Sequence, residues 1–345
     1  MKNKKTLLGF SIGLLLITLL GFAAVYQRKQ QVQEPISATA FKLNTVITVN
    51  IYDSKDKQLL DDVMALCDKY EQLFSRTLSS SEIFQLNHQT LKQEDGAFIL
   101  SPETAQLVSK GLYYGKLSGG AFDITIAPVS SLWDFTSEEK NVPSDEDIKA
   151  ALSLVNYENV KIDGNKLTFA QEGMGLDLGA IAKGYIADKM KEFLLSKGVK
   201  SATINLGGNV LCVGKKPDNT PFRIGIQKPF ADRSETIAVI DIEDKSVVSS
   251  GVYERYFEKD GVFYHHILNP DTGYPYDNHL VSVTIISDES VDGDGLSTTC
   301  FALGLEKGME LINSLPDVHA VFITDDYELH YSEDFQEDLK ITYMK

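Results

Sequence analysis

Apolar and polar residues alternate from Thr45 to Tyr52, with Ile47, Val49 and Ile51 on one face. A period of two predicts a strand that is buried on that face. Between Asp56 and Phe74 the apolar residues recur at spacings of three and four, which predicts an amphipathic helix. The folded part of the chain is therefore expected to open with a strand and then a helix.

Three later helices are predicted from capping signals and apolar periodicity. Ser101-Pro102-Glu103 combines a capping serine, a proline at the first helical position and an acid in the first turn. Ser144 and Asp147 have the spacing of a capping box. The apolar period continues from Gly179 to Lys197, and Gly198 supplies a stop signal.

The rest of the chain has mostly strand patterns. Val160 to Phe169 predicts a hairpin that turns at Asp163-Gly164, and Asp260-Gly261 predicts a second two-residue hairpin turn. Two final helices are expected at about 295–303 and 305–314. The predicted strands are 203–206, 222–226, 236–242, 253–258, 262–268, 281–287, 319–324 and 328–331. The fold class is therefore α+β, with mostly antiparallel sheets and packed helices in one large domain of two closely packed lobes over residues 39–345.

The N-terminus predicts a membrane-targeting segment. Three lysines among the first five residues precede Leu7 to Val25, a stretch of 19 uncharged and mostly apolar residues. This length suits a membrane span, and the basic flank favours an extracytoplasmic location for the rest of the chain. We assign residues 1–30 to a membrane anchor or signal segment and 31–38 to a polar linker. An uncleaved anchor in the cell membrane is preferred, because Gly21, Ala23 and Ala24 form only a mediocre cleavage site.

Composition excludes several other functions. The formal net charge of −16 argues against nucleic acid as a ligand, because phosphate backbones attract basic surfaces. Three widely spaced cysteines, Cys67, Cys212 and Cys300, fit neither a disulfide framework nor a zinc site. An anionic ligand would therefore need local help from a metal ion or from backbone amides.

Asp294 and Thr298 are the first candidates for metal binding. On a helix, a carboxylate and a hydroxyl four residues apart share one face, and both suit a hard cation such as Mg²⁺. Taken alone, Asp294 would more simply be a helix N-cap, and Asp177 a cap or turn residue. The segment from Gly179 to Gly184 has P-loop spacing, but it continues with Tyr185 where that motif needs lysine.

Two further segments could take part in chemistry. His265 and His266 end a predicted strand, and alternation lets only one of them face a given cleft, where an imidazole could act as an acid or base. Gly119 to Pro128 begins with two glycines that would let a flat ligand approach the backbone, with Phe122 to stack on it and Asp123 to accept hydrogen bonds. A buried strand entered through a glycine turn is the simpler interpretation of that segment.

Taken together and in this order, these segments resemble the ApbE family, the FAD:protein FMN transferases of bacterial cell envelopes. The similarity extends from Phe41 to about Ser314. Thr77 departs from the family pattern, since many members have an aromatic residue near this position that could cover the flavin. The matching stretches are 43–45, 74–75, 81–83, 86–87, 120–123, 132–133, 176–184, 205–208, 225–227, 250–251, 253–257 and 266–273.

The resemblance implies an FAD site with a metal ion. Mg²⁺ would be held by the backbone oxygen of Ala180 and the side chains of Asp294 and Thr298, on the FAD pyrophosphate. His266 matches the family's strand-end histidine, and either His266 or Asp294 would be the general base. The positions implied to contact FAD are Leu43, Ala121, Phe122, Asp123, Asp177, Lys183, Ile267 and Leu268.

The implied reaction is attack by a threonine or serine hydroxyl of an acceptor flavoprotein on the FMN-side phosphorus of FAD, with AMP leaving. A Mg²⁺-dependent FAD pyrophosphatase would use the same site with water as the nucleophile. A non-enzymatic surface protein that binds FAD is the third hypothesis. The set of Asp294, Thr298 and His266 favours an enzyme, because storage of FAD would not require it.

Overall fold

The computed structural model describes residues 34–135, 140–232 and 235–344. The anchor expected at residues 1–30 lies outside this range. Among the described residues, no helix combines the length and the apolar character needed to cross a bilayer. The first strand, β1 (Ile36–Lys42), begins inside the segment expected to be a linker, so the sheet includes its last three residues.

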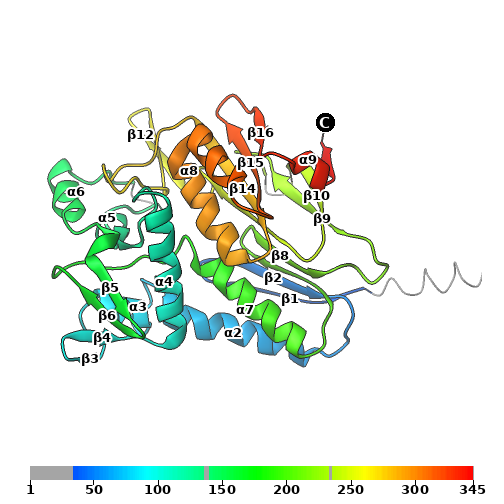
Figure 1. Cartoon of the computed structure of the whole chain (residues 1–345), viewed down its shortest axis with the longest axis horizontal. Coiled ribbons are helices and arrows are strands. Elements are labelled where there is room, and N and C mark those ends of the chain that lie inside the picture. Colours follow the sequence, from blue (N-terminus) through cyan, green and yellow to red (C-terminus); the bar gives the residue numbers. More distant parts are fainter. Residues whose placement is uncertain (1–33, 136–139, 233–234, 345) are drawn as a thin grey trace, which may run out of the picture.

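An eight-stranded sheet forms the centre of the molecule (Figure 1). Every strand pair in the described residues is antiparallel, which agrees with the mostly antiparallel sheets predicted from the sequence. Leu43 and Asn44 form the turn between the first two strands, both with positive φ. The strands follow the order β1, β2 (Thr45–Ile51), β7 (Ser201–Leu206), β8 (Asn209–Gly214), β11 (Ser246–Gly251), β14 (Leu280–Ser287), β15 (His319–Thr324) and β16 (Leu329–Tyr331).

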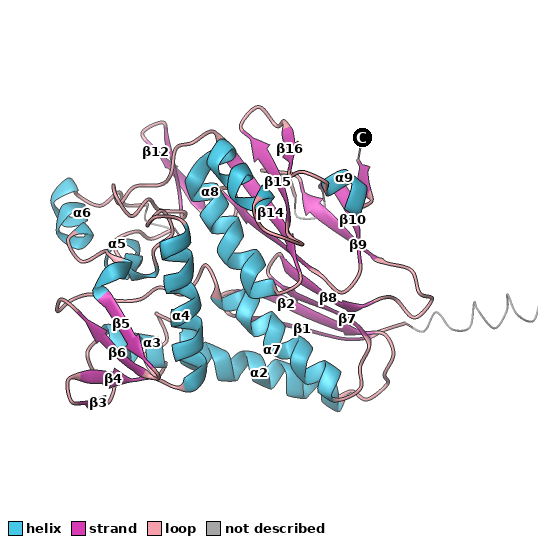
Figure 2. Cartoon of the chain, in the orientation of Figure 1, coloured by secondary structure: helices cyan, strands magenta, loops and turns pink. Residues whose placement is uncertain are grey.

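Helices cover one face of this sheet and a small second sheet covers part of the other (Figure 2). The small sheet buries its apolar side chains against the large one, together with a short C-terminal helix. The covering helices are α2 (Gln58–Phe74), α7 (Ala182–Ser196) and α8 (Ser290–Asn313). The small sheet and the short helix comprise β17 (Ile341–Tyr343), β10 (Thr236–Ile242), β9 (Phe222–Gln227) and α9 (Phe335–Asp338).

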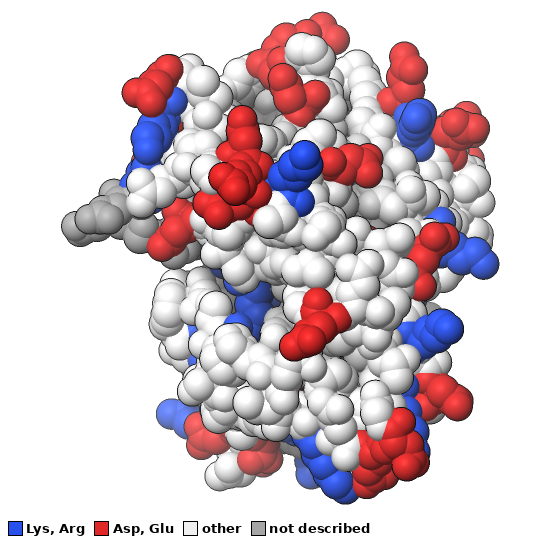
Figure 3. All heavy atoms as spheres, turned by 90° about the vertical axis from the view of Figure 1, so that its left-hand side faces the viewer, with Lys and Arg blue, Asp and Glu red and all other residues white. Residues whose placement is uncertain are grey.

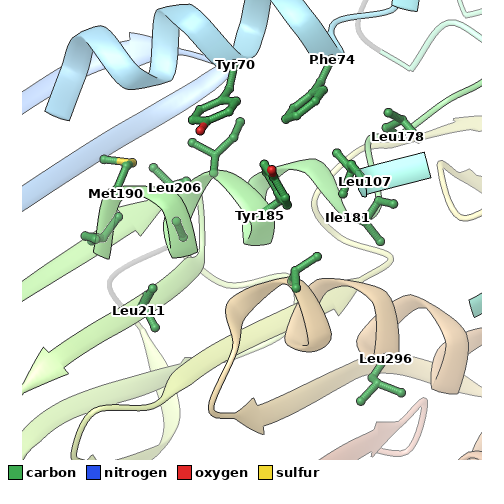
Figure 4. Close-up of a cluster of buried hydrophobic side chains, with 14 of the residues drawn as sticks. Tyr70, Phe74, Leu107, Leu178, Ile181, Tyr185, Met190, Leu206, Leu211 and Leu296 are labelled. Carbon is green, nitrogen blue, oxygen red and sulfur yellow. The ribbon is translucent and has the colours of Figure 1, made fainter. Parts of the chain in front are cut away.

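Residues between α2 and α7 build a second lobe, on the left of Figure 1. One continuous apolar core runs through both lobes, which explains why they pack as a single domain. Figure 4 shows part of this core, where Tyr70 and Phe74 of α2 lie over Tyr185 of α7. The lobe contains α3 (Glu82–Asn87), β3 (Gln93–Glu94), β4 (Ala97–Ile99), α4 (Pro102–Leu117), the 3₁₀ turns Ile124–Ile126 and Tyr157–Asn159, α5 (Ala127–Ser130), α6 (Asp145–Leu152), β5 (Val160–Asp163) and β6 (Lys166–Phe169).

Most local predictions agree with these elements. Ile47, Val49 and Ile51 are fully buried, and Ser101 and Ser144 cap α4 and α6 as their spacing indicates. A two-stranded hairpin of β12 (Tyr256–Lys259) and β13 (Val262–His265) turns at the predicted Asp260-Gly261.

Three predictions differ from the structure in detail. The first hairpin turns at Gly164-Asn165, one residue later than expected, because Asp163 still pairs with Lys166. The segment after Gly119 forms a 3₁₀ turn and α5, so the strand interpretation is wrong. The two expected final helices are α8, which is interrupted at Gly304 (φ 79°) and begins at Ser290.

Candidate active site

Two helices cross at the centre of the candidate site. The backbone N–H of Gly184, in the first turn of α7, donates to Asp294 Oδ2 of α8 at 2.6 Å. A Cβ on Gly184 would lie 2.2 Å from the backbone oxygen of Ser290, so only glycine permits this approach. Asp188 fixes the same crossing, because its carboxylate accepts the Ser290 and Val291 amides at 2.7 and 2.8 Å. These bonds cap the start of α8, and the N-cap interpretation of Asp294 is wrong.

Asp294 is a buried carboxyl group with few partners. It is 5% exposed, and burial raises its pKa, while the charge of Lys183 and the Gly184 amide oppose that shift. One turn later on α8, Thr298 Oγ1 lies 3.1 Å from Ser250 Oγ of β11. The carboxyl and hydroxyl groups therefore lie on one helix face, as their spacing predicts.

The oxygens at this crossing fit a hard cation. Gly184 lies in the first turn of α7, where amides have no partner within the helix, and its amide donates to Asp294. No backbone N–H of the described residues donates to Ala180 O, so this carbonyl is free to bind another group. A free carbonyl, a carboxylate and a hydroxyl are ligands that Mg²⁺ accepts. A cluster of three or more acidic, histidine or cysteine ligands is not found in the described part of the chain.

Asp177 lies in the segment that leads into α7 and is held by several partners. Its Oδ2 forms an ion pair with Arg76 Nε at 3.0 Å and accepts Ser130 Oγ at 2.9 Å. Its Oδ1 accepts the Gly179 amide at 2.9 Å. Just before it, the Asn87 side chain clamps both backbone groups of the preceding residue. The segment is thus fixed before any ligand binds.

The two adjacent histidines have different roles in the structure. His265 is 4% exposed, its Nε2 contacts Tyr276 O at 2.8 Å and its Nδ1 accepts the Ile267 amide at 3.2 Å. Both ring nitrogens of His265 are therefore occupied. His266 is half-buried, and only its Nδ1 contacts a backbone oxygen, that of Arg255 at 3.3 Å. His266 is the histidine that can exchange a proton with a ligand.

Positive charges surround the His266 imidazole. Burial lowers its pKa to about 3, and the charges of Arg255, His265 and Lys183 act in the same direction. The imidazole is therefore neutral at physiological pH and can accept a proton. An anionic ligand beside it would raise this pKa and make it a stronger base.

Phe122 and Asp123 do not act as the sequence suggests. Phe122 is 4% exposed and packs on Tyr114 with ring centroids 5.7 Å apart, so the expected stacking on a flat ligand is wrong. The Asp123 carboxylate already accepts the Thr125 amide at 2.7 Å and the Tyr157 amide at 2.8 Å. Its carboxyl group serves the fold, and burial raises its pKa.

The remaining candidate residues offer mainly backbone groups. Tyr276 OH donates to Ala121 O at 2.9 Å, which ties the segment around Ala121 to the loop after β13. Ile267 and Leu268 are buried in two different apolar clusters, so only their backbones can reach a ligand. Leu43 is half-buried against the main core, and no hydrogen bond or ion pair of the described residues joins it to the other candidates.

Comparison with known proteins decides the family. The ApbE family model matches residues 43–322. The chain belongs to the ApbE family. A FAD:protein FMN transferase of Klebsiella pneumoniae is 38% identical over 295 residues, covering 85% of this chain and 90% of that protein. A FAD:protein FMN transferase of Treponema pallidum is 32% identical and covers 95% of each chain.

Solved structures agree with this family membership. The flavin transferase ApbE from Vibrio cholerae superposes with a TM-score of 0.79 at 27% identity, covering 88% of this chain and 99% of that one. The ApbE protein from Thermotoga maritima gives a TM-score of 0.79 at 30% identity, with 88% of this chain covered. Membership of the ApbE family makes this chain an enzyme.

Three site residues of this ApbE chain were not singled out from its sequence. Ser250 contacts Thr298, Arg76 pairs with Asp177, and Arg255 borders His266. Ser250 and Arg255 lie in stretches that match the family, which is the signal that could have identified them.

Figure 3 shows a recess on the face at the left of Figure 1, with basic side chains inside it although the chain is acidic overall.

Proposed function

We propose that this ApbE-family enzyme transfers the FMN moiety of FAD to a threonine or serine hydroxyl of an acceptor flavoprotein and releases AMP. The observation that supports it most is the α7–α8 crossing, where Asp294 accepts the Gly184 amide at 2.6 Å and Thr298 lies one turn further along the same face of α8. The relatives named FAD:protein FMN transferase cover most of the chain and support the same activity. The oxygens fit Mg²⁺, which would neutralise charge on the FAD pyrophosphate.

Each residue then has a defined task. Asp294, Thr298 and Ala180 O would hold the metal ion, and the Gly184 amide keeps the Asp294 carboxylate in place at 2.6 Å. His266 would accept the proton of the attacking hydroxyl, since its imidazole is neutral and only one of its nitrogens has a protein partner. Asp294 is the poorer base, because a carboxylate on a metal ion has a low proton affinity.

FAD would bind along the rigid segments around this crossing. Asp177, whose pairing with Arg76 fixes its position, and Lys183 would contact the nucleotide through their side chains. Backbone and edge contacts with FAD would come from Leu43, Ala121, Phe122, Ile267 and Leu268. The Asp123 side chain would hold the loop behind these residues in its conformation. This preformed arrangement holds FAD for attack without a large rearrangement of the chain.

We also propose that the N-terminal segment anchors the enzyme in the cell membrane with its catalytic domain outside. The support is the basic flank followed by the apolar stretch from Leu7 to Val25. Membrane fractionation of cells, with protease added from outside, tests this. A catalytic domain recovered in the cytosol would contradict it.

The activity is tested by incubating the full chain with FAD, Mg²⁺ and candidate envelope flavoproteins, followed by intact mass spectrometry of each protein. The expected result is an acceptor that carries one FMN, equimolar AMP, and no adduct in EDTA. Release of FMN and AMP with no adduct on any acceptor would identify a pyrophosphatase instead. A protein that binds FAD and leaves it intact would contradict both enzymatic reactions.

A further inference from the structure

Arg255 lies directly beside the candidate base. It precedes β12, and its backbone oxygen accepts the His266 amide at 3.2 Å while contacting His266 Nδ1 at 3.3 Å. The Arg255 residue itself is exposed. The hairpin that follows packs its Phe257 and Tyr264 rings against Trp133, which fixes the position of the Arg255 backbone.

Arg255 has no counter-ion among the residues that the structure describes. Of the three arginines in the described residues, Arg76 has a carboxylate at 3.0 Å and Arg223 one at 3.8 Å. No carboxylate of the described residues lies within 4 Å of the Arg255 guanidinium. The chain has 49 acidic and 33 basic residues, so an arginine that is left without an acidic partner is notable.

A second unpaired cation lies near the same imidazole. Lys183, in the first turn of α7, also has no carboxylate of the described residues within 4 Å. The charges of Arg255 and Lys183 both lower the pKa of His266. Two segments that are far apart in the sequence therefore each place a positive charge near this imidazole. Two cations near a half-buried imidazole disfavour protonation of that imidazole. An anion bound between them would balance their positive charge.

The chemistry of the arginine side chain indicates which anion would bind here. A guanidinium presents two parallel N–H donors that match two oxygens of a phosphate, and its planar fork binds phosphate more specifically than an ammonium does. We infer that Arg255 binds the FMN-side phosphate of FAD and stabilises its negative charge while that phosphate is transferred. This role rests on the proposed function and adds a residue to it.

The step balances without a further reactant. The acceptor hydroxyl oxygen forms a new bond to the FMN-side phosphorus, and the bond from that phosphorus to the oxygen of AMP breaks. The hydroxyl proton passes to His266, and Arg255 keeps its own proton throughout. Binding of the phosphate would cancel the field of Arg255 at His266, so the imidazole becomes a better base only when FAD is present.

The test compares Arg255→Gln and Arg255→Lys with wild type, and uses Arg223→Gln on β9 as the matched control. FAD and inorganic pyrophosphate binding are measured by calorimetry on the full chain in EDTA, and transfer is measured by intact mass. Arg255→Gln is expected to weaken both ligands about 10-fold or more and to lower kcat about 100-fold. Arg255→Lys is expected to recover part of each loss, and Arg223→Gln to match wild type.

A readout that needs no turnover separates this inference from the proposed function. In the ligand-free protein, the pKa of His266, followed by NMR of labelled histidine, is expected to rise in Arg255→Gln and to stay low in Arg255→Lys. If wild type transfers no FMN, the proposed function fails, but the binding and NMR results still decide the role of Arg255. Unchanged pyrophosphate affinity and unchanged kcat in Arg255→Gln would overturn it.

Discussion

The amide of Gly184 donates its hydrogen bond to the carboxylate of Asp294, which lies 110 positions later in the sequence, at 2.6 Å. Gly184 is the third residue of α7, so its amide has no partner within the helix. One contact therefore has two effects: it orients the carboxyl group, and it gives a partner to an amide in the first turn of α7. The candidate metal site depends on how closely α7 approaches α8.

Gly184→Ala tests this approach. The added methyl group would meet the Ser290 backbone at 2.2 Å, so the helices must separate, at a cost of about 1–3 kcal/mol in the free energy of unfolding. Urea unfolding measures the loss, and transfer activity should fall with it. Ser196→Ala, at an exposed position in the last turn of the same helix, is the control and should change neither. A fully stable and active Gly184→Ala would refute the role of the crossing.

Asp294→Asn separates chemistry from folding. Its amide oxygen can still accept the Gly184 N–H, and burial disfavours the charged carboxylate, so stability should stay equal or rise by up to about 1 kcal/mol. Transfer should fall about 100-fold or more, because the proposed metal ion would lose its carboxylate ligand. Thermal unfolding with added Mg²⁺ should show a rise in Tm for wild type alone. The same rise in the variant would mean that Asp294 does not hold the ion.

His266 should make stability depend on pH. Its folded-state pKa of about 3 lies below that of a free histidine, so the unfolded chain takes up the proton first as the pH falls. The contribution of His266 is therefore present above pH 6.5 and is lost as the pH falls towards 3. Compared with His266→Asn, wild type should lose about 1–2 kcal/mol more between pH 7 and 4.5.

Urea unfolding at several pH values measures this difference. His88→Asn is the matched control, since His88 is exposed, stacks on Phe84 and contacts the Phe84 backbone oxygen through Nδ1 at 2.8 Å. The control removes an exposed histidine and leaves His266 in place. Parallel curves for wild type and His266→Asn would contradict the low pKa.

The Arg76–Asp177 ion pair holds the segment before α7 in one conformation and should therefore strengthen FAD binding. Both side chains are partly exposed, so the pair is expected to contribute only about 0.5–1 kcal/mol to stability. Arg76→Gln should raise KM for FAD about threefold to tenfold and leave kcat within about twofold. A double-mutant cycle with Asp177→Asn isolates the pair. Fully additive effects in that cycle would show that the two side chains act independently.

The local elements of the fold are well predicted by periodicity and caps. Ser101 and Ser144 cap helices where their spacing indicates, and Asp294 and Thr298 do share a helix face. β8 and β11 were not predicted. Their sequences show no clear alternation, although Gly207 and Gly208 before β8 form a two-residue turn after β7.

The partners within the site could not be read from the sequence. The contacts between Gly184 and Asp294 and between Ser250 and Thr298 join segments that are far apart in the chain. Phe122 illustrates the opposite problem. Glycines before an aromatic residue suit a ligand platform, but its burial is decided by Tyr114, a residue of α4 whose position depends on the tertiary fold.

The turn at Asp260-Gly261 has a consequence for the choice of base. It sets the register of β12 and β13, in which His265 lies opposite Tyr256 and turns inward, whereas His266 stays half-buried. Insertion or deletion of one residue at this tip would reverse the two side chains, because neighbours on a strand point to opposite faces. If His266 is the base, as proposed, this turn thus selects which of two identical side chains accepts the proton.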